Sequence, residues 1–460
     1  MGGGALDLVG LDREVARAHE AVVRFHAALR NKIHDPGWSP ADPLASFRHV
    51  AGRNAYEVVA AYPAGLSEEP IKAGLLSWIH ALTDVRVGID LDVSWQREAH
   101  TRRGRVLLES PRETSYEEAW RGVVFARDFA TRQLWLDAAA EQAPRLAPLA
   151  RDAAVPRVEV RKRLGLERSA GDGTGEISLA DLEMAARGFL RKTVDLRAAL
   201  RRESEVYRSA ETPHSRLAAW IGDALSTDAP EGWPARLTPR WFEEAFRAVS
   251  RGARLTLDLP KVVGASSFAR GLYGFGIGIR EGARSGLPFC VAMSPDRTDA
   301  HRIGFVFGAL PVEQTFQRKV LGLGERRAKG QARSLARTAL AEAVGVVARW
   351  LLTRDSESRR GSEWEEITCD VFHGPIDARF AGTWPARRGN ETSRLEALLE
   401  ALPLASDLVS RFDVDWYRNP KAGDWMRARS GGPARVPSAT RPDAMALASS
   451  LSKAFEEALG

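Results

Sequence analysis

The sequence predicts a mainly α-helical protein with a small β-sheet, in two regions joined by a connector. Three observations predict this fold. Long segments carry apolar residues at the spacing of a helix face, only short segments alternate apolar and polar residues, and seven glycines within residues 264–286 fall in a segment of helical periodicity. We expect an N-terminal helical region over 1–150, a connector over 151–176, and a C-terminal helical region over 177–460 with a small β element around 254–310.

The N-terminal region begins with a helix expected over 11–33. Five apolar residues in it keep a heptad pattern that is typical of a face packed on another helix: Val15, Ala18, Val22, Phe25 and Leu29. Shorter helices are expected at about 44–62 and 67–83. Residues 85–95 alternate apolar and polar side chains, which predicts a strand.

A long helix is then expected from Ser115 to about residue 142. Ser115 and Glu118 have the spacing of a capping box, in which each side chain accepts the backbone N–H of the other residue. Three prolines, many charges and a glycine-rich stretch follow in 144–176, which indicates the connector.

The C-terminal region combines helices with a few short strands. Short apolar runs predict strands over 254–259, 287–293, 303–310 and 367–372, the second and third forming a hairpin around a Ser-Pro-Asp turn. Helical spacing predicts helices over 178–206, 213–226, 238–251, 331–354, 392–411 and 440–459.

The glycine-rich segment is expected to be a helix with one nearly bare edge. An apolar stripe runs along it, and beside that stripe stand Ser267, Gly271, Gly274, Gly278 and Gly282. Each interior glycine costs about 1 kcal/mol relative to alanine. We therefore expect another helix, a strand or a ligand to approach this edge closely.

The start of this helix is a candidate anion site. Free N–H groups at a helix N-terminus attract phosphate or carboxylate. Four residues could complete the site: Lys261, Gly264, Ser267 and Arg270. Ser266 is the candidate nucleophile, with Asp299 or His301 as the acid–base group. The alternative is that Ser266 or Ser267 only caps a packing helix.

Two further patterns are candidates for metal binding. Asp90 and Asp92 would point the same way on a strand and could hold a divalent cation, or they could form the solvated face of that strand. Residues 172–181 resemble the second part of an EF-hand calcium loop, but Ala170 and Thr174 occupy ligand positions. The alternative there is a glycine-rich turn followed by a cap over Ser178–Asp181.

Seven basic residues precede and enter the helix expected at 331–354, and they could contact the phosphates of a nucleic acid: Arg318, Lys319, Arg326, Arg327, Lys329, Arg333 and Arg337. No aromatic residue lies between Arg318 and Arg349 to stack on bases, so a solvated helix face is the alternative. The net charge is only +6 over 460 residues, which does not indicate a basic arm.

Composition restricts the class of protein further. The two cysteines, Cys290 and Cys369, exclude a disulfide framework and favour a reducing cytoplasm. No apolar run of 18 residues occurs, so we expect no membrane span.

No complete catalytic constellation occurs, and the sequence identifies no cofactor. We therefore expect a cytoplasmic helical protein that binds a protein partner or an anionic small molecule without evident catalysis. Two alternatives stay open. One is a hydrolase or transferase that acts on an anionic small molecule at 261–270, and the other is a nucleic-acid binder that uses the 318–337 arginines.

Overall fold

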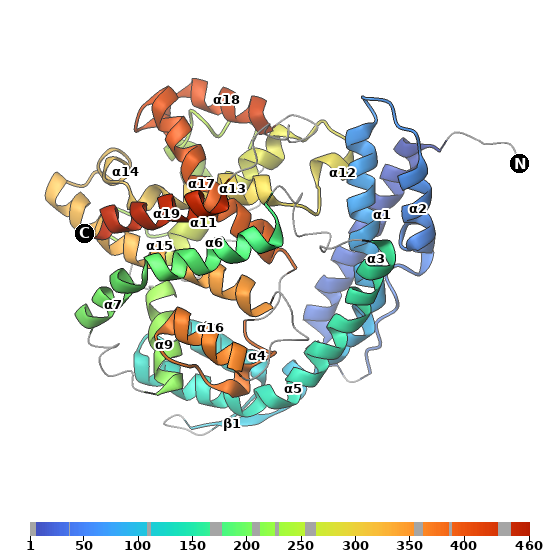
Figure 1. Ribbon diagram of the computed structural model, residues 1–460, viewed down its shortest axis with the longest axis horizontal. Coiled ribbons are helices and arrows are strands. Elements are labelled where there is room, and N and C mark those ends of the chain that lie inside the picture. The colour runs from blue at the N-terminus through green and yellow to red at the C-terminus, as the bar shows by residue number, and fades with distance from the viewer. Residues whose placement is uncertain are drawn as a thin grey trace, which may run out of the picture.

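The computed structural model describes residues 6–35, 37–107, 112–165, 177–204, 212–225, 230–253, 264–353, 362–385, 389–430 and 443–460. In this part of the chain the fold is mainly α-helical with one two-stranded antiparallel sheet, which confirms the predicted fold class. Helices α1 to α3 lie at the end of the molecule opposite the C-terminus (Figure 1). None of the described helices combines the length and apolar composition that a membrane span needs.

Helix α1 (Leu8–Lys32) is the first predicted helix, and the five residues of its heptad pattern are buried. It packs on α3 (Glu69–Thr101), with η1 (Ala45–Val50) and α2 (Arg53–Ala61) beside it. The carboxylate of Asp12 on α1 accepts the backbone N–H groups of Phe289 (2.9 Å) and Cys290 (2.7 Å), so a segment from far along the chain completes this core.

The strand predicted over 85–95 is wrong, because these residues lie inside α3. The alternating pattern also satisfies a helix: Val85, Ile89 and Val93 stand four residues apart and pack together against α1. Residues that are four positions apart lie on one face of a strand and also on one face of a helix. The apolar pattern of this short segment therefore fits both structures.

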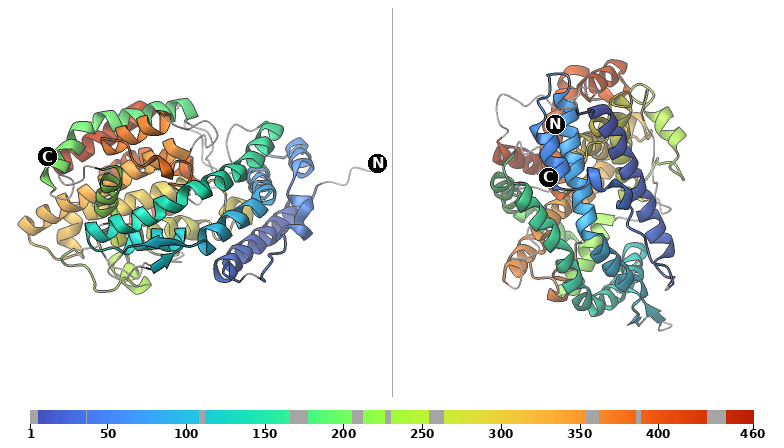
Figure 2. Two further views of the ribbon diagram at one scale, coloured as in Figure 1. Left: turned by 90° about the horizontal axis from the view of Figure 1, so that it is seen from below. Right: turned by 90° about the vertical axis from the view of Figure 1, so that its right-hand side faces the viewer.

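The two strands form a hairpin before α4 (Tyr116–Phe125). Strand β1 (Gly104–Val106) pairs with β2 (Arg112–Thr114) in the register Arg105 with Glu113. The Ser115–Glu118 capping box is confirmed. Figure 2 shows the hairpin at the outer surface of the molecule.

Helix α5 (Phe129–Leu164) follows α4 after a short break, so the long helix expected from Ser115 is two helices. Helix α5 continues through Pro144, Pro148 and Pro156, and the helix end expected near residue 142 is wrong. Buried alanines and leucines hold this helix against its neighbours although each proline removes a backbone hydrogen bond. The division into two regions stays a prediction, and the largest core contains residues from both.

The rest of the described chain is helical. The hairpin expected over 287–293 and 303–310 and the strand expected over 367–372 are wrong, because α12, α13 and α16 occupy these residues. A short apolar run fits a fully buried helix as well as a strand. The expected strand at 254–259 lies outside the described residues. The helices are α6 (Leu179–Lys192), α7 (Val194–Glu203), α9 (Pro213–Leu225), α10 (Pro239–Ala245), α11 (Ala265–Ala283), α12 (Phe289–Ala292), α13 (Thr298–Ala309), α14 (Gln314–Lys319), α15 (Glu325–Thr353), α16 (Ser362–Phe372), α17 (Glu391–Phe412), α18 (Pro420–Ser430) and α19 (Ala444–Leu459), with 3₁₀ turns at Leu310–Val312, Ala378–Phe380 and Trp416–Arg418.

The glycine-rich segment is helix α11, as predicted, and another helix does approach it closely. That helix is α13: a Cβ added at Gly276 would lie 2.6 Å from the carbonyl oxygen of Ile303. Gly304 on α13 gives the same close approach to Tyr273. The edge of α11 that contacts α13 is not the predicted glycine edge, because that edge did not include Gly276. Gly282 belongs to the predicted edge, and it packs on the backbone of Gly252.

Candidate functional site

Three of the four residues of the predicted anion site lie at the start of α11, and the site stays a prediction. Gly264 is the N-cap of α11, and the buried Ser266 hydroxyl donates to the carbonyl oxygen of Leu225. Ser267 is also buried, while Arg270 is exposed. Lys261 lies outside the described residues. The contact of Ser266 supports the packing alternative.

Asp299 and His301 lie two residues apart on α13 and have different partners. The Asp299 carboxylate accepts from Arg302 and lies 3.9 Å from the guanidinium of Arg284. The His301 ring contacts the Tyr273 hydroxyl through Nδ1 and the Asn390 side-chain amide through Nε2, at 3.0 Å. None of these contacts includes Ser266, the candidate nucleophile.

The surroundings of His301 determine the charge of its imidazole ring and which ring nitrogen carries the proton. The side chain is only 4% exposed, and burial lowers its pKa to about 2, with further lowering by Arg394, Arg297 and Arg280. The ring is therefore neutral at pH 7 and carries one proton. With the Asn390 Nδ2 donating to Nε2, that proton is on Nδ1 and the Tyr273 oxygen accepts it. This arrangement orients the ring within the core.

Paired charges surround this histidine between α11, α13 and α17. Arg302 donates to Glu400 at 3.2 Å, and Arg297 pairs with Glu281. Arg280 donates to the carbonyl oxygen of Ala292 at 2.9 Å, and Arg284 to that of Val291 at 3.1 Å. These arginines hold the segment around α12 in place. Sequence reasoning missed them because each belongs to no motif and its partner is distant in the chain or on another element.

We expect the protein to lose stability as the pH falls below about 6.5. The unfolded chain binds a proton on His301 near pH 6.5, whereas the folded protein binds it only near pH 2. Between these values the unfolded state holds more protons, so the free energy of unfolding falls by up to about 1.4 kcal/mol per pH unit. From pH 7 to pH 5 the loss from His301 is about 2 kcal/mol. Urea unfolding at several pH values measures it.

The matched variants for this test are His301→Gln and His49→Gln. Glutamine cannot titrate, so His301→Gln should show a shallower fall between pH 7 and pH 5 than the unmodified protein. His49 is exposed, so its replacement controls for the loss of an imidazole outside the core. An identical slope in all three proteins would contradict the prediction.

The predicted metal sites are not assembled in the described part of the chain. Asp90 and Asp92 are two residues apart on a helix, where side chains diverge by about 200°. Asp92 pairs with Arg157 of α5, while Asp90 is exposed. Among the described residues no group of three potential ligands forms a metal site. The EF-hand-like residues 172–176 lie outside the described residues, and Ser178 caps α6 at Asp181 as the alternative expected.

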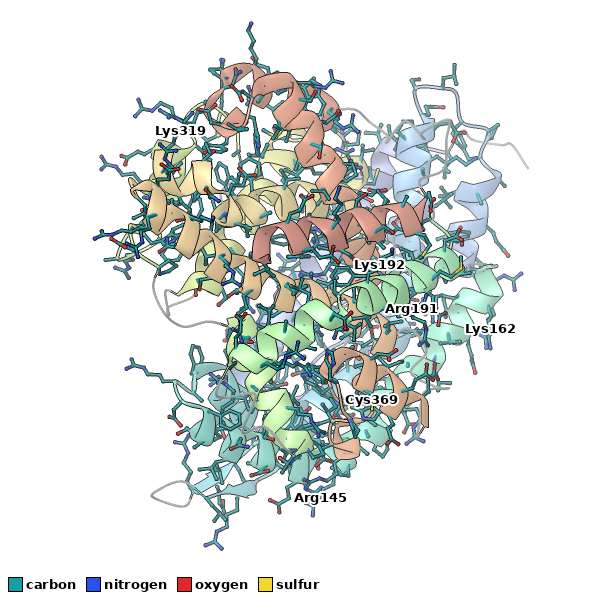
Figure 3. The ribbon with its side chains drawn as sticks, turned by 60° about the vertical axis from the view of Figure 1, so that its left-hand side comes forward. Arg145, Lys162, Arg191, Lys192, Lys319 and Cys369 are labelled. Carbon is teal, nitrogen blue, oxygen red and sulfur yellow. The ribbon has the colours of Figure 1, made fainter. Side chains whose placement is uncertain are left out.

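Four of the seven basic residues of 318–337 are neutralised by carboxylates. Lys319, which Figure 3 shows at the outer edge of the molecule, pairs with Asp415 at 2.6 Å. The others pair as Arg327 with Glu231 (2.6 Å), Arg333 with Glu203 (3.7 Å) and Arg337 with Asp223 (3.2 Å). These contacts support the solvated-face alternative over phosphate binding.

A large surface cleft, which we call the α4 cleft, lies between the hairpin, α4 and the start of α5. The empty space in the cleft, together with the open solvent at its mouth, is about 1230 Å³. It is lined by Arg112, Glu113, Thr114, Glu118, Arg121, Gly122, Phe125, Ala126, Arg127, Asp128, Thr131 and Trp135. No sequence motif marks this cleft, because β2, α4 and α5 each supply only part of its lining.

Arginine and carboxylate side chains both line the α4 cleft, and most of the carboxylates have partners within the protein. Two of its three carboxylates cap helices: Glu118 accepts the Ser115 N–H at 2.8 Å, and Asp128 accepts the Thr131 N–H at 2.8 Å. Hydrogen bonding to the backbone of Thr131 lowers the pKa of Asp128. Three arginines line the cleft, Arg112, Arg121 and Arg127, and Arg103 next to the hairpin forms an ion pair with Glu118.

The floor of the α4 cleft is rigid and aromatic. The Arg112 guanidinium lies over the Trp135 ring at 4.7 Å from its centroid, a cation–π contact. A Cβ at Gly122 would overlap the same ring, so only glycine lets α4 approach it. Phe125 at the edge of the cleft is 52% exposed. The α4 cleft therefore has guanidinium groups and an exposed apolar side chain next to each other.

The comparisons with known proteins leave the site to be interpreted from its own geometry. No family model matches the chain, and no curated protein is significantly similar to it.

Proposed function

We propose that this chain is a binding protein without catalysis that recognises an acidic segment of a partner protein in the α4 cleft. The single observation that carries the proposal is the cleft itself, which combines arginine side chains with an exposed phenylalanine. A cytoplasmic location belongs to the same proposal, since the two cysteines are unpaired.

Charge complementarity is the first support for an acidic segment. The cleft carries three arginines, whereas two of its three carboxylates are committed to helix caps. Arginine forms bidentate hydrogen bonds with carboxylates and is enriched in protein interfaces. An aspartate- or glutamate-rich partner would pair with these side chains.

Apolar and backbone groups give the second support. Phe125 is exposed in the cleft beside the arginines, and large exposed apolar side chains are energetically important when a partner covers them. Strand β2 pairs only with β1 among the described residues, and an extended partner segment would pair with the other edge of β2 next to the exposed Arg112 and Glu113. An extended acidic segment with one apolar side chain fits both features.

Selection from a displayed library of random peptides tests the proposal. We expect enrichment of peptides that combine several acidic residues with a large apolar one. The double variant Arg121→Glu/Arg127→Glu should bind the selected peptides at least about ten-fold more weakly, because two attractive contacts become repulsive. Fluorescence polarisation with a labelled selected peptide measures the dissociation constants.

The matched control is Arg191→Glu/Lys192→Glu, which changes the net charge equally at two exposed positions on α6 (Figure 3). It should bind as the unmodified protein does. Selection of peptides without acidic residues, or equal weakening in both double variants, would refute the acidic partner. Displacement of the peptide by single-stranded DNA with a steep salt dependence would favour a nucleic acid instead.

A further inference from the structure

Two histidine rings lie next to each other at the ends of α1 and α3, and we call them the His34–His100 pair. Their ring centroids are 5.5 Å apart, and the ring planes are inclined by 69°. His34 lies in the turn directly after α1 and is exposed. His100 lies in the last turn of α3 and is half-buried. An ion in solution can therefore reach both rings.

The backbone on both sides of His34 is held against α3. Before it, Ile33 is only 2% exposed and packs in one apolar cluster with Ile89 and Val93 of α3. After it, the backbone carbonyl of Trp38 accepts a hydrogen bond from Arg97 of α3 at 2.9 Å. The fold therefore fixes the position from which the His34 ring meets His100.

The hydrogen bond of His100 leaves one of its ring nitrogens free to bind a metal ion. Its Nδ1 lies 2.8 Å from the carbonyl oxygen of Gln96. A carbonyl oxygen only accepts, so in the neutral ring Nδ1 carries the proton and Nε2 has a free lone pair. Histidines that bind metals typically donate their other N–H to a carbonyl or carboxylate in this way. His34 makes no hydrogen bond with the described residues, so its ring can turn either nitrogen toward the same point.

The spacing of the two rings fits a shared ion. Zinc binds imidazole nitrogen at about 2.0–2.1 Å in tetrahedral geometry, which places the centroids of two bound rings about 5 Å apart. The observed distance of 5.5 Å is close to this value. Two protein ligands leave two positions for water, and the described residues supply no group of three ligands anywhere.

Two other histidines have acidic neighbours and serve as comparisons. The Nε2 atom of His214 lies 3.0 Å from the Asp137 carboxylate, but it lies equally close to the Arg379 guanidinium, whose charge repels a metal ion. His49 has one carboxylate at 3.8 Å, that of Glu14. Neither histidine has a second imidazole beside it among the described ring contacts.

We propose that the His34–His100 pair binds Zn²⁺ or another first-row divalent cation that prefers imidazole ligands. The Nε2 atom of His100 and one ring nitrogen of His34 are the protein ligands, and water completes the coordination. The bound ion ties the end of α1 to the end of α3. This site does not depend on the function proposed for the α4 cleft.

Isothermal titration of the full chain with zinc chloride near neutral pH tests the proposal. We expect one zinc ion per chain to bind with a dissociation constant below roughly 1 mM. Magnesium chloride should bind at least about ten-fold more weakly, because Mg²⁺ prefers oxygen ligands. Absence of zinc binding, or equal binding of the two ions, would overturn the proposal.

Four variants locate the binding. His34→Ala and His100→Gln should each weaken zinc binding at least about ten-fold, because one of two protein ligands is lost. His49→Gln and His214→Gln remove an imidazole outside the pair and should leave the dissociation constant unchanged. Circular dichroism confirms that each variant is folded. Unchanged binding in His34→Ala, or equal weakening in all four variants, would place the ion elsewhere and overturn the proposal.

Discussion

Replacing Gly282 by alanine is expected to lower the free energy of unfolding by about 3 kcal/mol. The added Cβ would overlap the carbonyl oxygen of Gly252, which is backbone and cannot rotate away. Helix α11 would have to move, and with it the aromatic cluster that packs on Phe275. Urea unfolding followed by circular dichroism measures the change.

Gly308→Ala is the matched control, because it also lies in a helix of this pair but has ordinary space around it. Its nearest atom to an added Cβ is 3.5 Å away. Alanine favours a helix over glycine by about 1 kcal/mol, so this variant should be as stable as the unmodified protein or more stable. Equal stability of the Gly282 and Gly308 variants would show that α11 has room to move.

Replacing Arg197 by leucine is expected to cost about 3–5 kcal/mol. This side chain is only 6% exposed and donates to the carbonyl oxygens of Asp370, Val371 and Leu190 (2.8 Å) and to the Thr193 hydroxyl (3.2 Å). The last carbonyl groups of a helix have no partner within it. Without the guanidinium, the C-terminus of α16 would be buried with unsatisfied acceptors. Chemical unfolding measures the loss.

Arg191→Leu controls for the loss of a positive charge near the same helices. Arg191 is exposed on α6, so its replacement should change stability by less than about 0.5 kcal/mol. Arg197→Lys should recover only part of the loss, because a single ammonium cannot reach both α6 and α16 as the forked guanidinium does. A fully stable Arg197→Leu variant would contradict the role given to this residue.

Features that depend only on residues close together in the sequence could be predicted from it. The face of α1, the Ser115 capping box and the helical glycine segment follow from local spacing, and the structure confirms them. The segment 85–95 shows where local spacing fails, since its apolar residues satisfy two periods. Tertiary contact with α1 decides between them, and a sequence does not show that contact.

The candidate sites could not be predicted, because their residues meet only in the fold. Tyr273 and Asn390 reach His301 from positions 28 and 89 residues away. The α4 cleft combines a strand, a helix and the start of another, and none carries a recognisable motif. The site at Ser266 was predicted from the general properties of a helix N-terminus. In the structure the Ser266 hydroxyl donates a hydrogen bond to a backbone carbonyl oxygen.

The bonds from Asp12 to the backbone of Phe289 and Cys290 have a consequence for synthesis on the ribosome. Helices α1 to α3 emerge early, but their shared interior includes Cys290 and Val291, which are translated about 190 residues after Thr101. At about 5–20 residues per second, the nascent helices wait roughly 10–40 s with apolar surface uncovered. During that interval they are a natural substrate for chaperones.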